Sequence, residues 1–269
     1  MSNLSSLFDA YSRKARLFPG LLTIFPIVIT AMAVFPALLT SSIGATLLTI
    51  CTSCGLLYAL SVFARSRGKA TEKRLLAVWG GWPTTAWLRH GDVNLDDLTR
   101  ERYRTYLVAN VPGLSLPTAE EQSADPRAAD SRYASGVKWL QEQCRGRNFP
   151  LIEKENAEYG FRRNLRGMKP LGVTGCLFAL FTTIAVAAWA SQWPPASFAA
   201  LVAVLKPAVA GAFLVDVVAL CGWVFIVSDG WVKDAGNQYA RALLAECDAK
   251  GGGKVAAARR PPNRKSPVK

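Results

Sequence analysis

Four long stretches of apolar residues constrain the fold of this chain more than any other feature. They cover residues 20–40, 43–64, 171–190 and 207–227. The first three contain no charged residue, and the fourth contains only Asp216. A helix needs about 20 mostly apolar residues to cross a bilayer, and helices in a soluble core rarely lack charge over this length. The sequence therefore predicts four membrane-spanning helices.

The stretches come in two pairs, and this pairing predicts the overall organisation. We expect an all-α integral membrane protein with four transmembrane helices in two hairpins and an inserted, mostly helical cytoplasmic module. The predicted regions are a cytoplasmic lead-in (1–16), a first hairpin (17–64), the module (65–169), a second hairpin (170–228), a cytoplasmic helix (229–249) and a disordered basic tail (250–269).

The distribution of positive charge predicts the orientation. The chain has 32 Lys and Arg residues and a formal net charge of +13. Most of the basic residues lie in the module or after the last apolar stretch, and the two links inside the predicted hairpins contain only Lys206. Because Lys and Arg are enriched in cytoplasmic loops, we expect both termini and residues 65–169 to face the cytoplasm.

Helical patterns recur in the polar segments. We expect helices over 72–78, 96–108, 130–143, 151–165 and 231–247, with any strand content confined to 108–116. Thr118 and Glu121 have the spacing of a capping box, in which each side chain caps the other's backbone N–H. The three glycines of 251–253 are expected to end the last helix.

No catalytic motif is present, and we expect neither an enzyme nor a bound cofactor. The chain has one histidine, His90, so it lacks the material for a conventional triad or a His-rich metal site. Cys51 and Cys54 have the C-x-x-C spacing of zinc and redox sites. They lie inside an apolar stretch without a second Cys or His pair, so small helix-packing residues are the better interpretation.

Asp216 is the sharpest single candidate for a functional residue. An acid within a membrane span is costly and is a functional hypothesis by default. It either lines a cation path or proton relay, or it makes a structural hydrogen bond. It has no obvious basic partner in the predicted spans, so it is either protonated or hydrogen-bonded to hydroxyl groups of the second stretch, such as Thr49 or Thr52.

The segment Trp79–His90 has the composition of a ligand cradle. Its glycines let a ligand approach the backbone, Trp82 can stack a base, Thr84 and Thr85 offer hydroxyls, and Arg89 offers a planar cation for phosphate. The alternative is an interfacial turn, since tryptophans near a membrane exit often lie at headgroup depth.

Arg162 and Arg163 form a second candidate ligand site. They precede the third apolar stretch, where the bias towards positive cytoplasmic residues also explains them. The basic segments 65–74 and 162–169 leave and enter the predicted spans, and together they would attract anionic lipid headgroups.

The number of spans, the inserted module and these two stretches resemble small bacterial membrane effectors of nucleotide-signalling antiphage systems. The resemblance is one of architecture. It implies a homo-oligomer whose module senses a nucleotide second messenger or a cytoplasmic protein, and whose spans form a pore or disrupt the membrane. The alternative is a non-catalytic membrane scaffold or secretion-associated protein that docks a cytoplasmic partner. DNA is not an expected partner.

Overall fold

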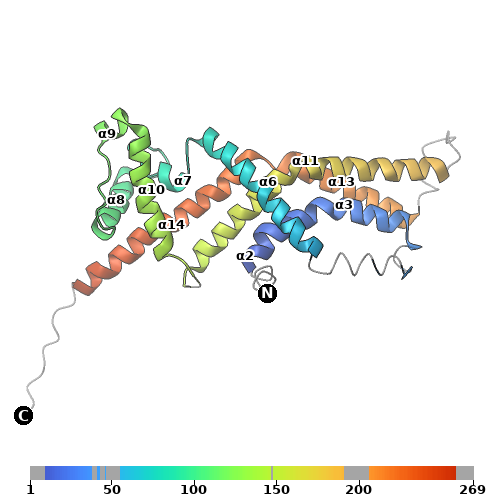
Figure 1. Cartoon of the computed structure of the whole chain (residues 1–269), viewed down its shortest axis with the longest axis horizontal. Helices are drawn as coiled ribbons and strands as arrows, with labels where there is room; N and C mark the ends of the chain where they lie inside the picture. The colour runs from blue at the N-terminus through green and yellow to red at the C-terminus, as the bar shows by residue number, and fades with distance from the viewer. Residues whose placement is uncertain are drawn as a thin grey trace, which may run out of the picture. The chain divides into compact units, whose positions relative to one another are not determined.

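The computed structural model describes residues 10–37, 41–42, 46, 55–146, 148–190 and 206–258. Helices are the only regular elements in these ranges (Figure 1). The main ones are α3 (Phe18–Val34), α6 (Gly55–Trp79), α8 (Asp97–Asn110), α10 (Pro126–Gln143), α11 (Pro150–Ala190), α13 (Pro207–Cys221) and α14 (Asp229–Ala258). Shorter elements are α2 (Ala10–Ser12), the π-helix η1 (Arg13–Leu17), α7 (Pro83–Ala86), α9 (Ala119–Ala124) and the π-helix η2 (Gly222–Ile226).

Three continuous helical segments are long and apolar enough to cross a membrane. They are Arg13–Val34, Pro150–Ala190 and Pro207–Ile226. The prediction of an all-α membrane protein is therefore confirmed at this level. Most of the predicted second span lies outside the described residues, which resume at Gly55 within α6. The fourth span and the pairing into hairpins accordingly stay predictions.

The chain divides into two compact units. The first consists of Met1–Leu75 and Asn156–Ala235 and contains the three apolar segments apart from residues 150–155, so we call it the membrane unit. The second consists of Leu76–Glu155 and Gly236–Lys269, and we call it the polar unit.

Glycines allow close helix packing in the membrane unit. A Cβ atom at Gly167 of α11 would lie 2.6 Å from the backbone carbonyl of Arg67 in α6, so the two backbones approach directly there. A Cβ atom at Gly172 would overlap the ring of Trp223 in η2. Such small residues are typical of contacts between membrane helices. Around these glycines lies a buried core that includes Ala64, Leu165, Met168, Cys176, Trp223 and Val227.

The prolines of the first apolar stretch have different effects. Pro26 lies inside α3, whereas α3 ends at Val34, two residues before Pro36. Phe35 has φ −120° and ψ 65°, which fits the steric restriction on a residue that precedes proline. α3 then runs side by side with α13 (Figure 1).

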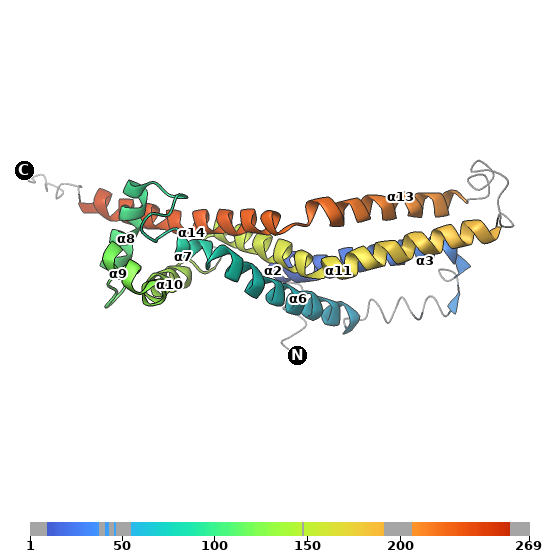
Figure 2. The same cartoon turned by 90° about the horizontal axis from the view of Figure 1, so that it is seen from above.

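The polar unit contains the predicted helices of the module. α8 matches the predicted helix 96–108 to within two residues at each end, and α10 begins four residues before the predicted helix 130–143 and ends with it. Thr118 and Glu121 form the predicted capping box at α9. In this part of the chain α8 continues to Asn110, and residues 111–116, all of which the structure describes, form no strand. In both views α8, α9 and α10 gather beside the second half of α14 (Figures 1 and 2).

α14 departs from the expectation in two ways. Its residues Ala240, Leu243, Leu244 and Cys247 are buried in the same core as Leu107, Tyr133 and Leu140. The core of the polar unit thus needs a segment beyond the predicted module of 65–169. In addition, the helix does not end at the glycines of 251–253 but continues to Ala258. A helix that is already nucleated can tolerate glycine, which costs only about 1 kcal/mol per residue.

Candidate functional site

Asp216 is fully buried within the apolar part of the membrane unit. Its Oδ2 atom accepts a hydrogen bond of 2.6 Å from the Thr30 hydroxyl on α3. Its Oδ1 atom has no hydrogen-bond partner among the described residues. The structure thus joins Asp216 to the first apolar stretch, a partner that the sequence did not predict. The predicted partners Thr49 and Thr52 lie outside the described residues.

This geometry leaves one carboxylate oxygen of Asp216 able to accept a further bond. Buried polar oxygens are normally satisfied by a donor, and buried charges by an opposite charge or a metal. The Oδ1 atom can therefore accept a hydrogen bond, a proton or a cation. Thr30 is itself only 3% exposed, so its hydroxyl holds the carboxyl group in a fixed position.

A second polar cluster surrounds Glu72 near the polar end of α6. The Glu72 carboxylate accepts bonds from Arg163 Nη1 at 2.6 Å, Lys69 Nζ at 2.7 Å and the Tyr159 hydroxyl at 3.2 Å. Glu72, Tyr159 and Arg163 are each less than 9% exposed. Opposite charges buried at this distance are strongly interdependent, because removal of one leaves the other uncompensated.

The pKa values in this cluster follow from its geometry. Burial by itself would raise the pKa of Glu72, but the hydrogen bond from Lys69 and the charge and hydrogen bond of Arg163 outweigh it, so the pKa is lowered. At neutral pH Glu72 is therefore ionised.

Asn164 extends this cluster to the N-terminal helix. Its Oδ1 atom accepts from Arg163 Nε at 3.1 Å, and its Nδ2 atom donates to the Ala15 carbonyl at 2.6 Å. Asn164 is fully buried. The Asn164 amide thereby ties α11 to η1 through its Nδ2 atom, while its Oδ1 atom links it to Arg163 on the same helix.

Asp229, the first residue of α14, bridges two other helices. Its two oxygens accept bonds from the Arg74 guanidinium at 2.8 and 2.9 Å, and Oδ1 also accepts from Arg166 Nε at 2.8 Å. The hydrogen bonds from Arg74, followed by the charge of Arg166, lower the pKa of Asp229. The basic segments 65–74 and 162–169 thus come together as expected, but Asp229 and Glu72 form ion pairs with some of their cations.

The predicted ligand-binding arginines of α11 are both engaged within the membrane unit. Arg163 is buried against Glu72. Arg162 Nε donates to Glu158 at 2.8 Å, its Nη1 donates to the Trp231 carbonyl at 3.1 Å, and its guanidinium lies 4.8 Å from the centre of a Trp231 ring. An anion at either residue would have to replace these contacts.

In the polar unit, the predicted cradle of Trp79–His90 divides into a buried and an open part. Thr84 and Thr85 are buried, with exposures of 2% and 8%, whereas Trp82 is 38% exposed. Arg89 donates to Asp130 through Nε and Nη2 at 2.7 and 2.8 Å, and to the Gly80 carbonyl at 2.6 Å. The structure therefore brings Arg89 to an open surface and withdraws the two hydroxyls from it.

A cavity of about 460 Å³ lies beside Arg89. The residues that line it are Gly80, Arg89, Gln122, Ser123, Pro126 and Asp130. Gly80 has φ +74° and Gly81 has φ +122°, conformations that favour glycine. A Cβ atom at Gly81 would lie 3.1 Å from the Arg89 guanidinium, so the glycine also leaves room for that side chain.

His90 belongs to a network behind this cavity that the sequence did not reveal. Its Nε2 atom lies 2.7 Å from Arg104 Nη1, and Arg104 Nη2 donates to the Pro117 carbonyl at 2.7 Å. The same Nε2 atom lies 3.0 Å from the Pro117 carbonyl, so the His90 ring is held between Arg104 and Pro117. The backbone N–H of His90 donates to Gln122, which also accepts from the Tyr133 hydroxyl at 3.0 Å.

Comparisons of the chain with models of protein families, with curated proteins and with solved structures found no match. The candidate sites accordingly stand on geometry alone. Among the described residues, no group of three or more His, Cys, Asp or Glu side chains is placed to hold a metal ion.

Proposed function

We propose that this protein is a membrane effector whose polar unit senses a ligand or partner and whose oligomerised spans form a pore or disrupt the membrane. The observation that supports this proposal most is the buried Asp216 carboxyl group, which has Thr30 on one oxygen and no described partner on the other. Acids inside membrane segments commonly mark ion or proton paths. A single chain of three or four spans offers little room for a path, so the proposal includes a ring of several copies.

In this proposal both termini and residues 65–169 face the cytoplasm of a bacterial inner membrane. The supporting observation is the charge distribution, since most of the 32 Lys and Arg residues lie in 65–169 or after the last apolar stretch. The resemblance to effectors of antiphage signalling gives the biological setting, with a nucleotide second messenger as the candidate trigger.

The cavity beside Arg89 is the proposed sensing site. A phosphate could replace Asp130 as the partner of the planar Arg89 guanidinium, with Gln122 and Ser123 as further polar groups. A ligand changes the equilibrium between two states only if it binds one of them better. In this proposal the two states differ in the Arg89–Asp130 ion pair, which is intact without the ligand and broken when phosphate binds Arg89.

Leakage of a membrane-impermeant dye from expressing cells tests the pore role. Wild type, Asp216→Ala and the control Val218→Ala should be compared at matched membrane abundance. Val218 lies on the same helix and is 64% exposed, so its truncation should leave leakage unchanged. We expect Asp216→Ala to abolish leakage. Equal leakage from wild type and Asp216→Ala would refute the role of Asp216.

The alternative function is a non-catalytic scaffold or secretion-associated protein that docks a cytoplasmic partner. A specific observation favours it: Thr84 and Thr85 are buried and Arg89 is paired with Asp130, so the Trp79–His90 stretch also serves as a packed turn. Recovery of one stoichiometric cytoplasmic protein with the full chain, together with no leakage from wild type under any trigger tested, would support the scaffold over the effector.

A further inference from the structure

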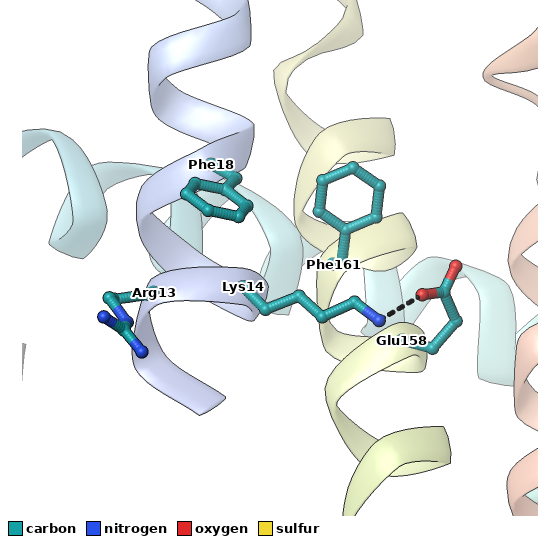
Figure 3. A pocket seen from close by; sticks show the side chains of 5 residues that line it. All are labelled: Arg13, Lys14, Phe18, Glu158 and Phe161. Carbon is teal, nitrogen blue, oxygen red and sulfur yellow. Dashed lines mark ion pairs between the residues drawn. The ribbon is translucent and has the colours of Figure 1, made fainter. Parts of the chain in front are cut away.

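A cavity of about 500 Å³ lies in the membrane unit between the N-terminal helix and α11. Arg13, Lys14, Phe18, Glu158 and Phe161 line it. Figure 3 shows the rings of Phe18 and Phe161 on the two opposite helices, with the Lys14–Glu158 ion pair beneath them. The cavity therefore has an apolar end and a charged end.

Local backbone structure explains why the cavity forms here. A Cβ atom at Gly160 would lie 3.0 Å from the Ala15 Cβ atom, so η1 and α11 approach closely at this glycine. The bond from Asn164 to the Ala15 carbonyl fixes the same contact. The wide turn of a π-helix shifts the side chains of Arg13 and Lys14 from α-helical positions, and such turns often occur at functional sites.

The charge at the polar end is not fully neutralised. Lys14 Nζ lies 2.9 Å from Glu158, which also accepts from Arg162 at 2.8 Å. Arg13 is exposed and forms no ion pair with any residue in the described ranges. Among the described residues, one acid thus pairs with two cations, and no acid competes with an anion for the guanidinium of Arg13. Guanidinium groups bind phosphate oxygens in a bidentate manner.

The position along the chain indicates which anion is suited to this cavity. Phe18 is the first residue of α3 and lies two residues after Arg16, the last charged residue before the first apolar stretch. On α11, Phe161 lies ten residues before Leu171, where the third apolar stretch begins. The cavity therefore lies where the chain passes from polar to apolar composition, which is the depth of lipid headgroups.

We propose that this cavity binds one anionic phospholipid, with the phosphate on Arg13 and Lys14 and an acyl chain along Phe18 and Phe161. An anionic head and an apolar tail match the two ends of the cavity, whereas inorganic phosphate would use only the cations. The inference does not depend on a pore, because it requires only that α3 and α11 enter a membrane. This binding at one defined site differs from the general attraction of anionic headgroups to the basic segments 65–74 and 162–169.

The test uses the purified full-length chain in a neutral detergent. Phosphatidylglycerol, phosphatidylcholine and glycerol 3-phosphate are titrated separately, and bound molecules are counted by native mass spectrometry. The variants are Arg13→Ala, Phe18→Ala and the control Arg65→Ala. Arg65 is exposed, lies in the basic segment 65–74 and does not line the cavity. Its replacement removes one positive charge, as Arg13→Ala does. Thermal melting without lipid verifies that each variant is folded.

We expect phosphatidylglycerol to bind with a stoichiometry of one and to displace phosphatidylcholine. Arg13→Ala should weaken this binding on the order of tenfold, the effect of one hydrogen-bonded charge. Phe18→Ala should weaken it several-fold, and Arg65→Ala less than about twofold. Equal losses in Arg13→Ala and Arg65→Ala would overturn the site in favour of unspecific charge attraction. Binding of glycerol 3-phosphate as tight as that of phosphatidylglycerol would overturn the lipid in favour of a phosphate site.

Discussion

Gly68 of α6 lies against Asn164 of α11 so closely that a methyl group at residue 68 would overlap the Asn164 side chain and approach its Cα atom to 2.8 Å. Asn164 is also the residue that binds the Ala15 carbonyl and accepts from Arg163. The absence of a side chain at one position therefore permits a polar cluster that joins η1, α6 and α11. This relationship supports the first prediction.

Substitution of Gly68 by alanine should destabilise the membrane unit. The new methyl group must displace a buried amide or separate two helices, and overpacking of this kind costs about 1–3 kcal/mol. The measurement is the melting temperature of the detergent-solubilised chain. Gly55→Ala is the matched control, since Gly55 lies on the same helix and a Cβ atom there would meet no described atom within 4 Å. A Gly68→Ala protein as stable as Gly55→Ala would contradict the close contact.

Glu72→Gln should lower the free energy of unfolding at pH 7 by about 3 kcal/mol. The substitution leaves the buried Arg163 without its counter-charge, and loss of one member of a buried pair typically costs this amount. Glu142→Gln is a suitable control, because Glu142 forms an exposed pair with Arg145 and such pairs contribute about 0–1 kcal/mol. Similar losses in both variants would argue against a special role of the buried pair.

The same substitution predicts a pH dependence. The pKa of Glu72 in the folded chain is lowered from its ordinary value of 4.5. Its stabilising effect is therefore fully present above pH 4.5 and is lost as the pH falls through the lower, folded-state pKa. The difference in melting temperature between wild type and Glu72→Gln should shrink on acidification below pH 4.5. A difference that stays constant between pH 7 and the acid limit would contradict the assignment.

Thr30→Val should reduce the stability of the membrane unit by about 1 kcal/mol, because hydrogen bonds between membrane helices contribute on this scale. Thr30→Ser keeps the hydroxyl group and should stay near wild type. When both partners become apolar, the cost of an unsatisfied oxygen disappears. The double variant Thr30→Val/Asp216→Leu should accordingly be more stable than Thr30→Val alone. The measurement is a double-mutant cycle on melting temperatures, and strict additivity would show that the two residues do not interact.

His90→Ala should loosen the polar unit by about 1–3 kcal/mol, since it removes the ring nitrogen that contacts Arg104 Nη1 and the Pro117 carbonyl in a mostly buried setting. Hydrogen exchange of residues 76–155 should become faster, while the helices of the membrane unit keep their protection. His90→Gln, whose side-chain amide offers both an acceptor and a donor, should exchange more slowly than His90→Ala. Faster exchange throughout the chain would instead indicate a general loss of folding.

Charge-free length and helical periodicity predicted most of the fold because they are local properties. The spans around Thr30 and Asp216 and the helices α8 and α10 follow from residues that are close in sequence. The capping box is equally local, since Thr118 and Glu121 are three residues apart. Such features need no knowledge of the tertiary structure.

The pairing of charges was not predictable in the same way. Arg163 and Glu72 are separated by 91 positions, and each looks like an ordinary member of a basic segment. The excess of cations in the sequence suggested that Arg163 binds a ligand, whereas in the structure Arg163 pairs with Glu72 of the same chain. The pocket at Arg13 was missed for the same reason, because its two aromatic walls come from helices that are distant in sequence.

The contribution of α14 to the core of the polar unit has a consequence for how the protein is made. Residues 76–155 leave the ribosome well before Leu243 and Leu244, and the apolar segment Pro207–Ile226 is synthesised in between. The core that contains Tyr133 and Leu140 can close only after that segment and the first half of α14 have been synthesised. A nascent chain that stalls before Leu243 therefore exposes an unfinished core.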